Sequence, residues 1–251
     1  MSRLGLVARQ VRYEDIAFWR NPVVAVFTFA FPLMFMVLAQ LVFAGRVDIE
    51  GTSPALFYTP AIVAFTVVNV CFVSIAMTVT LARDEGVLKR IRGTPLSLGS
   101  YLVARVIHAL LITLLLTVIV VVSGGLLFGA PVPIDRLPTL VLLVTLGAAA
   151  FAALGLAVSG LIPDSHAAPA LVNVIVLPLY VISDVFIPID SGSPVAMLAG
   201  VFPVQHLALA LQSVWQPSTQ PLDPIDLAWL GAWGLLGLVV ALRTFSWEPR
   251  G

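Results

Sequence analysis

The hydrophobic positions of this chain gather into long continuous runs, which shorter polar and charged stretches interrupt. Six runs reach roughly the 18 to 20 residues that a helix needs to cross the hydrocarbon core of a bilayer. They cover residues 23–44, 56–82, 101–128, 137–162, 167–187 and 225–242. Because the runs are continuously apolar rather than alternating, they favour spanning helices over barrel strands. We therefore predict an all-α integral membrane protein with six transmembrane helices.

The basic residues predict which side of the membrane each end of the chain occupies. Lys and Arg concentrate in the cytoplasmic segments of membrane proteins. With the N-terminus and the C-terminus both in the cytoplasm, eleven of the thirteen basic residues lie inside, and only Arg46 and Arg136 lie outside. The six spans and their connections take up residues 1–251, so we expect a single membrane domain.

The segment before the first run, residues 1–22, predicts an interfacial helix that lies in the plane of the headgroups. Its apolar face is formed by Leu4, Val7, Val11 and Phe18. The residues expected at the membrane interface are Arg9, Arg12, Trp19 and Arg20. A plain basic cytoplasmic tail is the alternative interpretation.

The loop between the second and third runs, residues 83–100, carries six of the 26 charged residues of the chain. Asp84 and Glu85 precede Lys89 by five and four positions, a spacing that can support a short helix. An apolar strip follows at helical spacing, formed by Val87, Leu88 and Ile91. Residues 93–95, Gly-Thr-Pro, then stop the helix. Such a helix suits insertion into a groove on a cytoplasmic partner, and a solvated positive-inside loop is the alternative.

The last long connection, residues 188–224, is predicted to lie outside and contains no Lys or Arg. Two mostly apolar pieces, residues 195–201 and 204–215, flank Pro203, and neither is long enough to span a membrane. We predict an outer re-entrant helical hairpin with Trp215 near the interface.

Candidate chemistry inside the membrane is sparse. Asp184 is the one acid well inside an apolar run, so it is a candidate for the translocation path, with an interfacial or capping role near Pro188 as the alternative. The three histidines are dispersed and Cys71 is the only cysteine, so we expect no metal site. The net charge is zero, which gives nucleic-acid binding no electrostatic support.

Several of these segments resemble the ABC type-2 permeases, in particular the bacterial drug-export kind typified by daunorubicin-type transporters. Residues 20–22, Arg-Asn-Pro, are similar to that family's entry into its first span. Residues 84–88 and 94–97 resemble its coupling-helix signature, and residues 177–179, 185–188 and 202–204 resemble its fifth span and outer hairpin. Val87 stands where the family usually has threonine, and Asp184 stands where a small or polar residue is usual.

The resemblance implies a permease of the bacterial inner membrane that works with a second permease copy or paralogue and with cytoplasmic ABC ATPase subunits. The residues that would contact the ATPase are Asp84, Glu85, Gly86, Val87, Leu88, Ile91, Thr94 and Pro95. Lys89, the only lysine, does not lie in a phosphate-binding loop, so we expect no catalytic residue and no cofactor in this chain, with ATP and magnesium on the partner.

The expected function is therefore export of hydrophobic drugs or lipid-like substrates, driven by ATP hydrolysis on another chain. A proton-coupled secondary transporter or channel is the alternative, although that class usually carries ionisable residues deep in several spans. A membrane enzyme or a scaffold subunit without transport is a third possibility. A requirement for ATP rather than for a proton gradient separates the first two.

Overall fold

A computed structural model describes residues 3–43, 53–183, 185, 194–216 and 222–244 of the chain. Across these residues the secondary structure is helical, with no strand, which agrees with the predicted all-α class. The elements in chain order are α1 (Arg3–Trp19), α2 (Pro22–Phe43), α3 (Pro54–Val67), the π-helix η1 (Val68–Ser74), α4 (Ile75–Asp84), α5 (Val87–Arg92), α6 (Leu98–Phe128), the 3-10 helix η2 (Ile134–Arg136), α7 (Leu137–Leu161), α8 (Ala168–Val181), α9 (Pro194–Ala199), α10 (Pro203–Trp215) and α11 (Pro224–Thr244).

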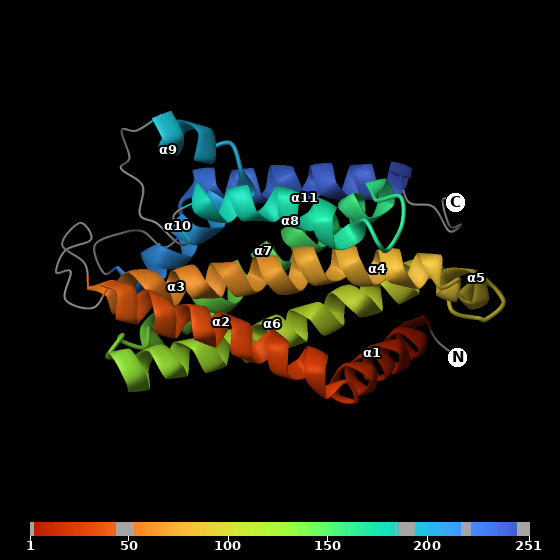
Figure 1. The fold of residues 1–251 in the computed structure, drawn as a ribbon, viewed down its shortest axis with the longest axis horizontal. Helices are drawn as coiled ribbons and strands as arrows, with labels where there is room; N and C mark the ends of the chain where they lie inside the picture. The colour runs from red at the N-terminus through yellow and green to blue at the C-terminus, as the bar shows by residue number, and fades with distance from the viewer. Residues whose placement is uncertain (1–2, 44–52, 184, 186–193, 217–221, 245–251) are drawn as a thin grey trace.

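The long helices form an elongated bundle with two distinct ends (Figure 1). The first end, here called the α5 end, holds α1, α5 and the last turn of α11; the opposite α9 end holds α9 and the start of α3. Five segments are long and apolar enough to cross a membrane, namely Pro22–Val42, Pro54–Asp84, Leu98–Phe128, Ile134–Leu161 and Pro224–Thr244. The chain is therefore built as a multi-pass membrane protein.

The expected span at residues 167–187 is represented by α8, which is shorter than we predicted. This apolar helix has 14 residues, which at 1.5 Å per residue give it a length of about 21 Å, less than the hydrocarbon thickness of about 30 Å. It starts at the α5 end, beside α4, and Pro178 lies inside it. Ile182 and Ser183 follow it in a turn, and Asp184 lies outside the described residues. A sixth span therefore stays a prediction.

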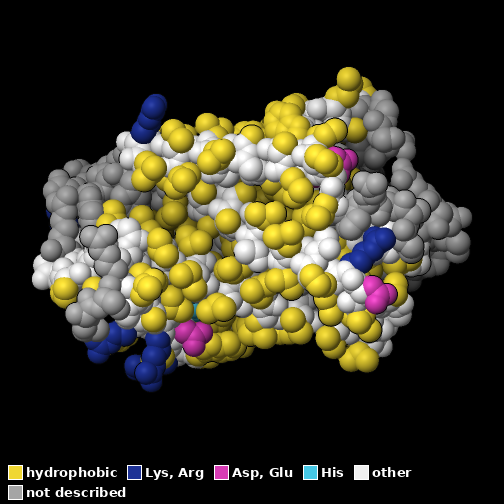
Figure 2. Space-filling view, turned by 180° about the vertical axis from the view of Figure 1, so that it is seen from behind, with side chains coloured by type: hydrophobic (Ala, Val, Ile, Leu, Met, Phe, Trp, Pro, Cys, Tyr) yellow, Lys and Arg dark blue, Asp and Glu magenta, His cyan; other side chains and the backbone are white. Residues whose placement is uncertain are grey.

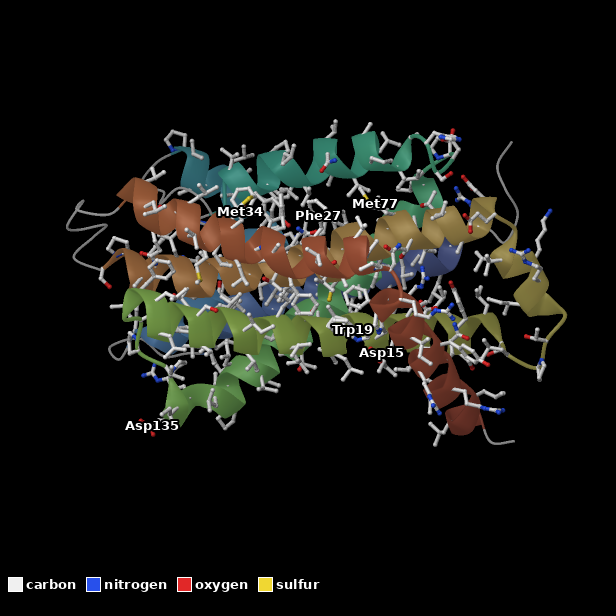
Figure 3. The ribbon with its side chains drawn as sticks, turned by 60° about the horizontal axis from the view of Figure 1, so that its bottom comes forward. Asp15, Trp19, Phe27, Met34, Met77 and Asp135 are labelled. Carbon is white, nitrogen blue, oxygen red and sulfur yellow. The ribbon has the colours of Figure 1, made fainter. Side chains whose placement is uncertain are left out.

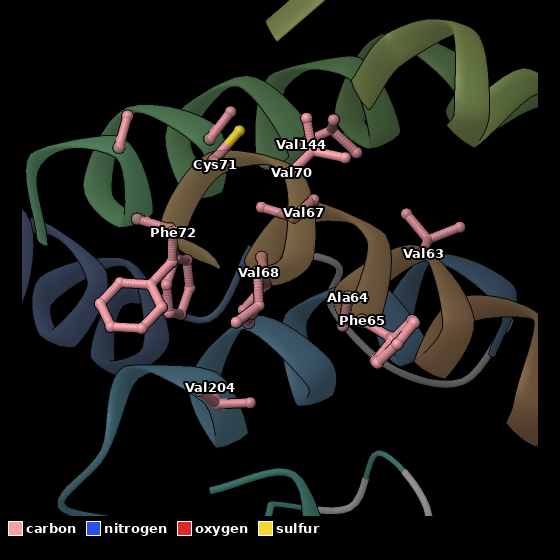
Figure 4. Packing of buried hydrophobic residues seen from close by; sticks show 14 of the residues in the cluster. Val63, Ala64, Phe65, Val67, Val68, Val70, Cys71, Phe72, Val144 and Val204 are labelled. Carbon is pink, nitrogen blue, oxygen red and sulfur yellow. The ribbon is translucent and has the colours of Figure 1, made fainter. Parts of the chain in front are cut away.

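The centre of the bundle is the continuous helix formed by α3, η1 and α4. Tyr58, Phe65 and Ile75 on this helix are almost completely buried. Figure 4 shows Val70 beside Val144 of α7, while Val68 faces Val204 of α10. The Cys71 sulfur lies 3.4 Å from the Thr113 hydroxyl of α6. The seven residues of η1 widen the helix in the middle of the membrane segment, a feature that is rare and often accompanies functional sites.

Small residues allow α7 to approach its neighbours closely, as is typical of membrane helix interfaces. A Cβ atom added to Gly155 of α7 would lie 2.8 Å from the carbonyl oxygen of Phe72 in η1. On α11, a Cβ atom added to Gly237 would lie 2.8 Å from the backbone nitrogen of Leu154 in α7. Backbone-to-backbone contact thus fixes α7 between η1 and α11.

The described part of the predicted outer hairpin consists of α9 and α10, which lie at the α9 end (Figure 1). Met197 and Leu198 of α9 are exposed, whereas α10 is buried along most of its length against α3, α7 and α11. The side chain of Trp215 is 5% exposed and packs in the hydrophobic core, and its position near the membrane interface stays a prediction.

Hydrophobic side chains are spread over the rear face of the bundle between its two ends (Figure 2). Charged side chains gather toward the ends in the same view. An apolar middle section between charged ends is the surface expected of a protein that spans a lipid bilayer.

Candidate functional site

The connection between α4 and α6 contains a short helix, α5, between two stops. After α4, Gly86 adopts a φ of +71°, a left-handed conformation that a residue without a Cβ atom takes without strain. The six-residue α5 follows and ends at Gly93. Ser97 then starts α6, since its hydroxyl accepts a hydrogen bond of 3.2 Å from the backbone N–H of Ser100. The sequence led us to expect a short helix in this loop.

We expected the apolar strip of α5 to face a partner, but it faces the bundle instead. Leu88 is completely buried against Ala82 and Tyr101. The partly buried side chains around them are Val87, Ile91, Leu96, Leu98 and Leu102. A helix of six residues has too few backbone hydrogen bonds to be stable by itself. Its hydrophobic side is therefore needed for packing against the bundle. The side left to meet a partner is basic, with Lys89 and Arg90 exposed.

We predicted that the acids before α5 would pair with Lys89, and they do not. Asp84 instead accepts a hydrogen bond from the backbone N–H of Ser165 and lies 3.4 Å from Nε of Arg83. Glu85 is exposed. The break at Gly86 separates the acids from α5, so the spacing of one continuous helix does not apply. At the other stop, the Thr94 hydroxyl donates a hydrogen bond of 2.8 Å to the Ile91 carbonyl, and Pro95 is exposed.

Arg83 is a buried cation that the sequence reading assigned only to an inside loop. Its side chain is 3% exposed, and its guanidinium donates hydrogen bonds to the carbonyl oxygens of Ser159, Ile162 and Pro163 at 3.1, 2.8 and 3.0 Å. These carbonyls belong to the last turn of α7 and the residues after it. Arg83 and Asp84 thus join α4 to the turn between α7 and α8.

The N-terminal helix α1 docks on α6 through an ion pair. Nη2 of Arg105 on α6 lies 3.0 Å from Oε2 of Glu14, whose other oxygen accepts from Gln10. Phe18 packs on the hydrophobic core beside Phe29 of α2. The residues predicted to lie at the interface are all exposed, namely Arg9, Arg12, Trp19 and Arg20. Figure 3 shows Asp15 and Trp19 near the end of α1, where it meets α2 and α6.

A cavity of about 530 Å³ lies among α1, α2, α3, η1, α4, α6 and α8. Its wall is mainly apolar, with the aromatic residues Phe27, Phe31 and Phe35 contributed by α2. Ser74 of η1 and Asn173 of α8 add neutral polar groups from two other sides. A mostly hydrophobic cavity with a few converging polar groups is the usual form of a small-molecule site.

The ionisable groups of this cavity are concentrated at one place. Glu14, Arg105 and His108 line it where α1 meets α6, and Asp15 lies 3.9 Å from His108. The cavity therefore has a mainly apolar wall and a group of ionisable side chains at one edge, which fits an amphipathic molecule. Asp184, our candidate for the translocation path, lies outside the described residues.

A second polar cluster lies at the α9 end. His206 of α10 is hydrogen bonded to Asp226 of α11 at 2.7 Å and to the Gly200 carbonyl at 2.8 Å. Burial alone would lower the pKa of His206, but the hydrogen bonds to Asp226 and Gly200 and the charges of Asp226 and Asp223 outweigh burial and raise it. In the residues that the structure describes, no group of three or more His, Cys, Asp or Glu side chains could hold a metal ion.

Sequence reasoning missed the roles of Arg83 and of the Glu14–Arg105 pair. A signal for the second was present, because Arg105 is the only charge inside the predicted third span, and a charge at that depth requires a partner. No comparable signal existed for Arg83, whose acceptors are backbone carbonyls about 80 residues away in sequence.

Comparison with known proteins adds a family assignment to this geometry. The family model described as ABC-2 type transporter matches residues 6–214 of the chain. This range includes most of α1, the α4–α6 connection, every element that lines the cavity, and nearly all of α10. A search of curated proteins found no match.

Proposed function

The chain belongs to the ABC-2 type transporter family, and we propose that it exports hydrophobic drugs or lipid-like molecules at the expense of ATP. Members of the family are membrane-spanning permease subunits of ABC transporters and generally work with an ABC ATPase. We further propose that ATP and magnesium bind to such a partner and that the complex contains a second permease, either an identical copy or a paralogue.

The cavity among α1, α2, α3, η1, α4, α6 and α8 is the observation that carries the proposed substrate class. Its apolar wall suits the hydrophobic part of a drug or an acyl chain, since burial of apolar surface contributes about 25 cal/mol per Å². The ionisable side chains Glu14, Arg105 and His108 at its edge suit a polar or ionised group on the same molecule. Asp184 remains a proposed residue of the path.

We place the protein in the bacterial inner membrane with its α5 end in the cytoplasm. Eleven of the thirteen basic residues support this orientation. The single domain, residues 1–251, would then comprise an interfacial helix in residues 1–22, an ATPase-coupling loop in residues 83–100 and an outer re-entrant hairpin in residues 188–224. In the coupling loop, the exposed Lys89 and Arg90 support contact with an acidic surface of the ATPase.

The test is reconstitution of the permease with the ATPase that copurifies with it in proteoliposomes. We expect ATP to drive net movement of a fluorescent lipid analogue or a hydrophobic dye across the bilayer, with no movement when a non-hydrolysable ATP analogue replaces ATP. A protonophore should leave this movement unchanged. Transport that does not require ATP and stops when the proton gradient is removed would instead support a proton-coupled secondary transporter.

A further inference from the structure

The helix α7 makes an arginine contact near each of its ends. In its last turn and just after it, Arg83 of α4 binds the carbonyl oxygens of Ser159, Ile162 and Pro163. Immediately before its first residue, Arg136 of η2 donates hydrogen bonds of 2.8 Å to the carbonyl oxygens of Ser213 and Gln216. The two contacts connect α7 to α4 at the α5 end and to α10 at the α9 end.

Both arginines bind the same kind of acceptor. The last carbonyls of a helix have no partner within the helix and carry the negative end of its dipole. Arg83 meets such carbonyls at the end of α7, and Arg136 meets them at the end of α10. A planar guanidinium holds five N–H donors in a fixed arrangement, so it can serve several carbonyls from one position, whereas the ammonium of lysine has three donors on a flexible stem.

The helix between these contacts is built to move as one body. The 25-residue α7 has its only proline at its beginning, where proline does not disturb helical bonds. Its Gly155 lies against the backbone of η1, and its Gly147 lies against Leu207 of α10. A displacement of one end of α7 is therefore transferred to the other end rather than absorbed within the helix.

The α5 end of this assembly includes the loop proposed to meet the ATPase. Asp84 lies next to Arg83, binds the backbone of Ser165 and is separated from α5 only by Glu85 and Gly86. Leu88 fixes α5 onto Ala82 of α4 and Tyr101 of α6. A push on α5 therefore acts on the residues that hold the end of α7.

We infer that Arg83 and Arg136 are positioning residues that join α4, α7 and α10 into one unit, which carries movement of α5 to the opposite face of the membrane. The inference rests on the proposed function, because α5 is taken as the ATPase contact. It goes beyond that function in naming the two side chains and the helix through which the movement passes. The physical requirement is a set of contacts that move together.

The first experiment uses the full-length permease alone in lipid nanodiscs, with Cys71→Ala as the background. Spin labels on the exposed pair Lys89→Cys and His166→Cys report on the α5 end, and labels on Asp135→Cys and Leu209→Cys report on the α9 end. We expect narrow distance distributions in the parent. Arg83→Gln should broaden the distributions at both ends, and Arg136→Gln should broaden the distribution at the α9 end.

Two further variants keep this experiment decisive. Arg83→Lys retains the charge and part of the bonding, so it should fold and give intermediate widths if Arg83→Gln does not yield stable protein. Arg243→Gln is the matched control, because Arg243 is an exposed arginine at the end of α11, outside the proposed unit. Distributions at the α9 end that are identical in the parent, Arg83→Gln and Arg83→Lys would overturn the inference.

The second experiment adds the copurifying ATPase. In the parent complex, ATP should shift the distance between the labels at positions 135 and 209. This shift should be lost in Arg83→Gln and in Arg136→Gln while ATPase binding persists, and the Arg243→Gln complex should retain it. A full shift in either test variant contradicts the inference. Failure of the parent to bind any ATPase contradicts the proposed function instead, and the nanodisc result still decides whether the unit exists.

Discussion

Nδ1 of His206 lies 2.7 Å from Oδ1 of Asp226, so a side chain of α10 is hydrogen bonded to the first turn of α11. The other ring nitrogen lies 2.8 Å from the Gly200 carbonyl, and the ring stacks on Trp229 at a centroid distance of 5.4 Å. A neutral imidazole can donate to only one of these two oxygens, whereas the protonated ring donates to both. The cluster therefore favours the charged form of His206.

The pH dependence of stability follows from this preference. The pKa of His206 in the folded protein is raised above its ordinary value of about 6.5. The folded state therefore binds this proton more tightly than the unfolded state. We expect the stabilisation to be complete below pH 6.5 or so and to be lost as pH rises through the raised pKa. Thermal unfolding in detergent across this range should show the decline in the parent protein.

The control for the histidine prediction is His206→Gln, which should remove the decline over the same pH range. Asp226→Asn should weaken it, because the amide lacks the charge that favours the protonated ring. A parent and a His206→Gln variant with the same pH dependence would show that this cluster does not contribute.

Close packing at Gly155 gives a second prediction. Gly155→Ala places a methyl group 2.8 Å from the Phe72 carbonyl, which neither backbone can accommodate without moving. We expect a loss of about 1–3 kcal/mol, the usual cost of overpacking, measured as a lower thermal unfolding temperature in detergent.

The matched control for Gly155 is Gly231→Ala in α11, where an added Cβ atom meets nothing within 4 Å. An open glycine inside a helix should gain about 0.5–1 kcal/mol from alanine. Equal effects of the two substitutions would contradict the close approach of α7 to η1.

The ion pair between α1 and α6 provides a third prediction. Glu14→Gln leaves the mostly buried guanidinium of Arg105 without its carboxylate, and Nε and Nη1 of Arg105 already have no hydrogen-bond partner. We expect a loss of about 1.5–3 kcal/mol in the docking of α1, seen as faster proteolysis of residues 3–19. Exchanging the charges in a Glu14→Arg and Arg105→Glu double variant should recover part of this loss; no recovery would argue against a direct pair.

Hydrophobic patterning was sufficient to predict the helical membrane fold, because lipid demands long apolar runs whatever their neighbours are. The five long candidate spans lie close to predicted runs. The orientation of α5 was not predictable from its own residues. Leu88 reads equally well as a residue facing a partner and as one facing the bundle, and only the position of Tyr101 on α6 decides between them.

Contacts to backbone atoms are invisible in a sequence for a related reason. Arg83 and Arg136 bind carbonyl oxygens, which every residue possesses, so no residue type marks the acceptors. Side-chain pairs such as Glu14–Arg105 are easier to anticipate, since the charge of each member limits the choice of partner. The cavity depends on how seven elements pack together, and the sequence alone offered only Asp184 as a candidate for the path.

The cavity itself can be tested by filling it. Ser74→Trp adds a large side chain to the η1 wall of the cavity, so we expect the export rate to fall at least tenfold, or about 1.4 kcal/mol of barrier, while ATPase binding is retained. Val118→Trp is the control, because Val118 is 59% exposed on α6 and does not line the cavity. Unchanged export by Ser74→Trp would exclude this cavity from the path.

The two sides of α5 should respond differently to substitution. Leu88→Ala removes a completely buried side chain, and a truncation of this kind costs about 2–5 kcal/mol, more than so short a helix can lose and stay in place. We therefore expect residues 85–96 to become sensitive to protease in the permease alone. Lys89→Ala removes an exposed charge, so it should leave protease resistance unchanged and instead slow association with the ATPase, most strongly at low salt. If Lys89→Ala has no effect on association at any salt concentration, the basic side of α5 is not the ATPase contact, even though Leu88 still holds the helix in place.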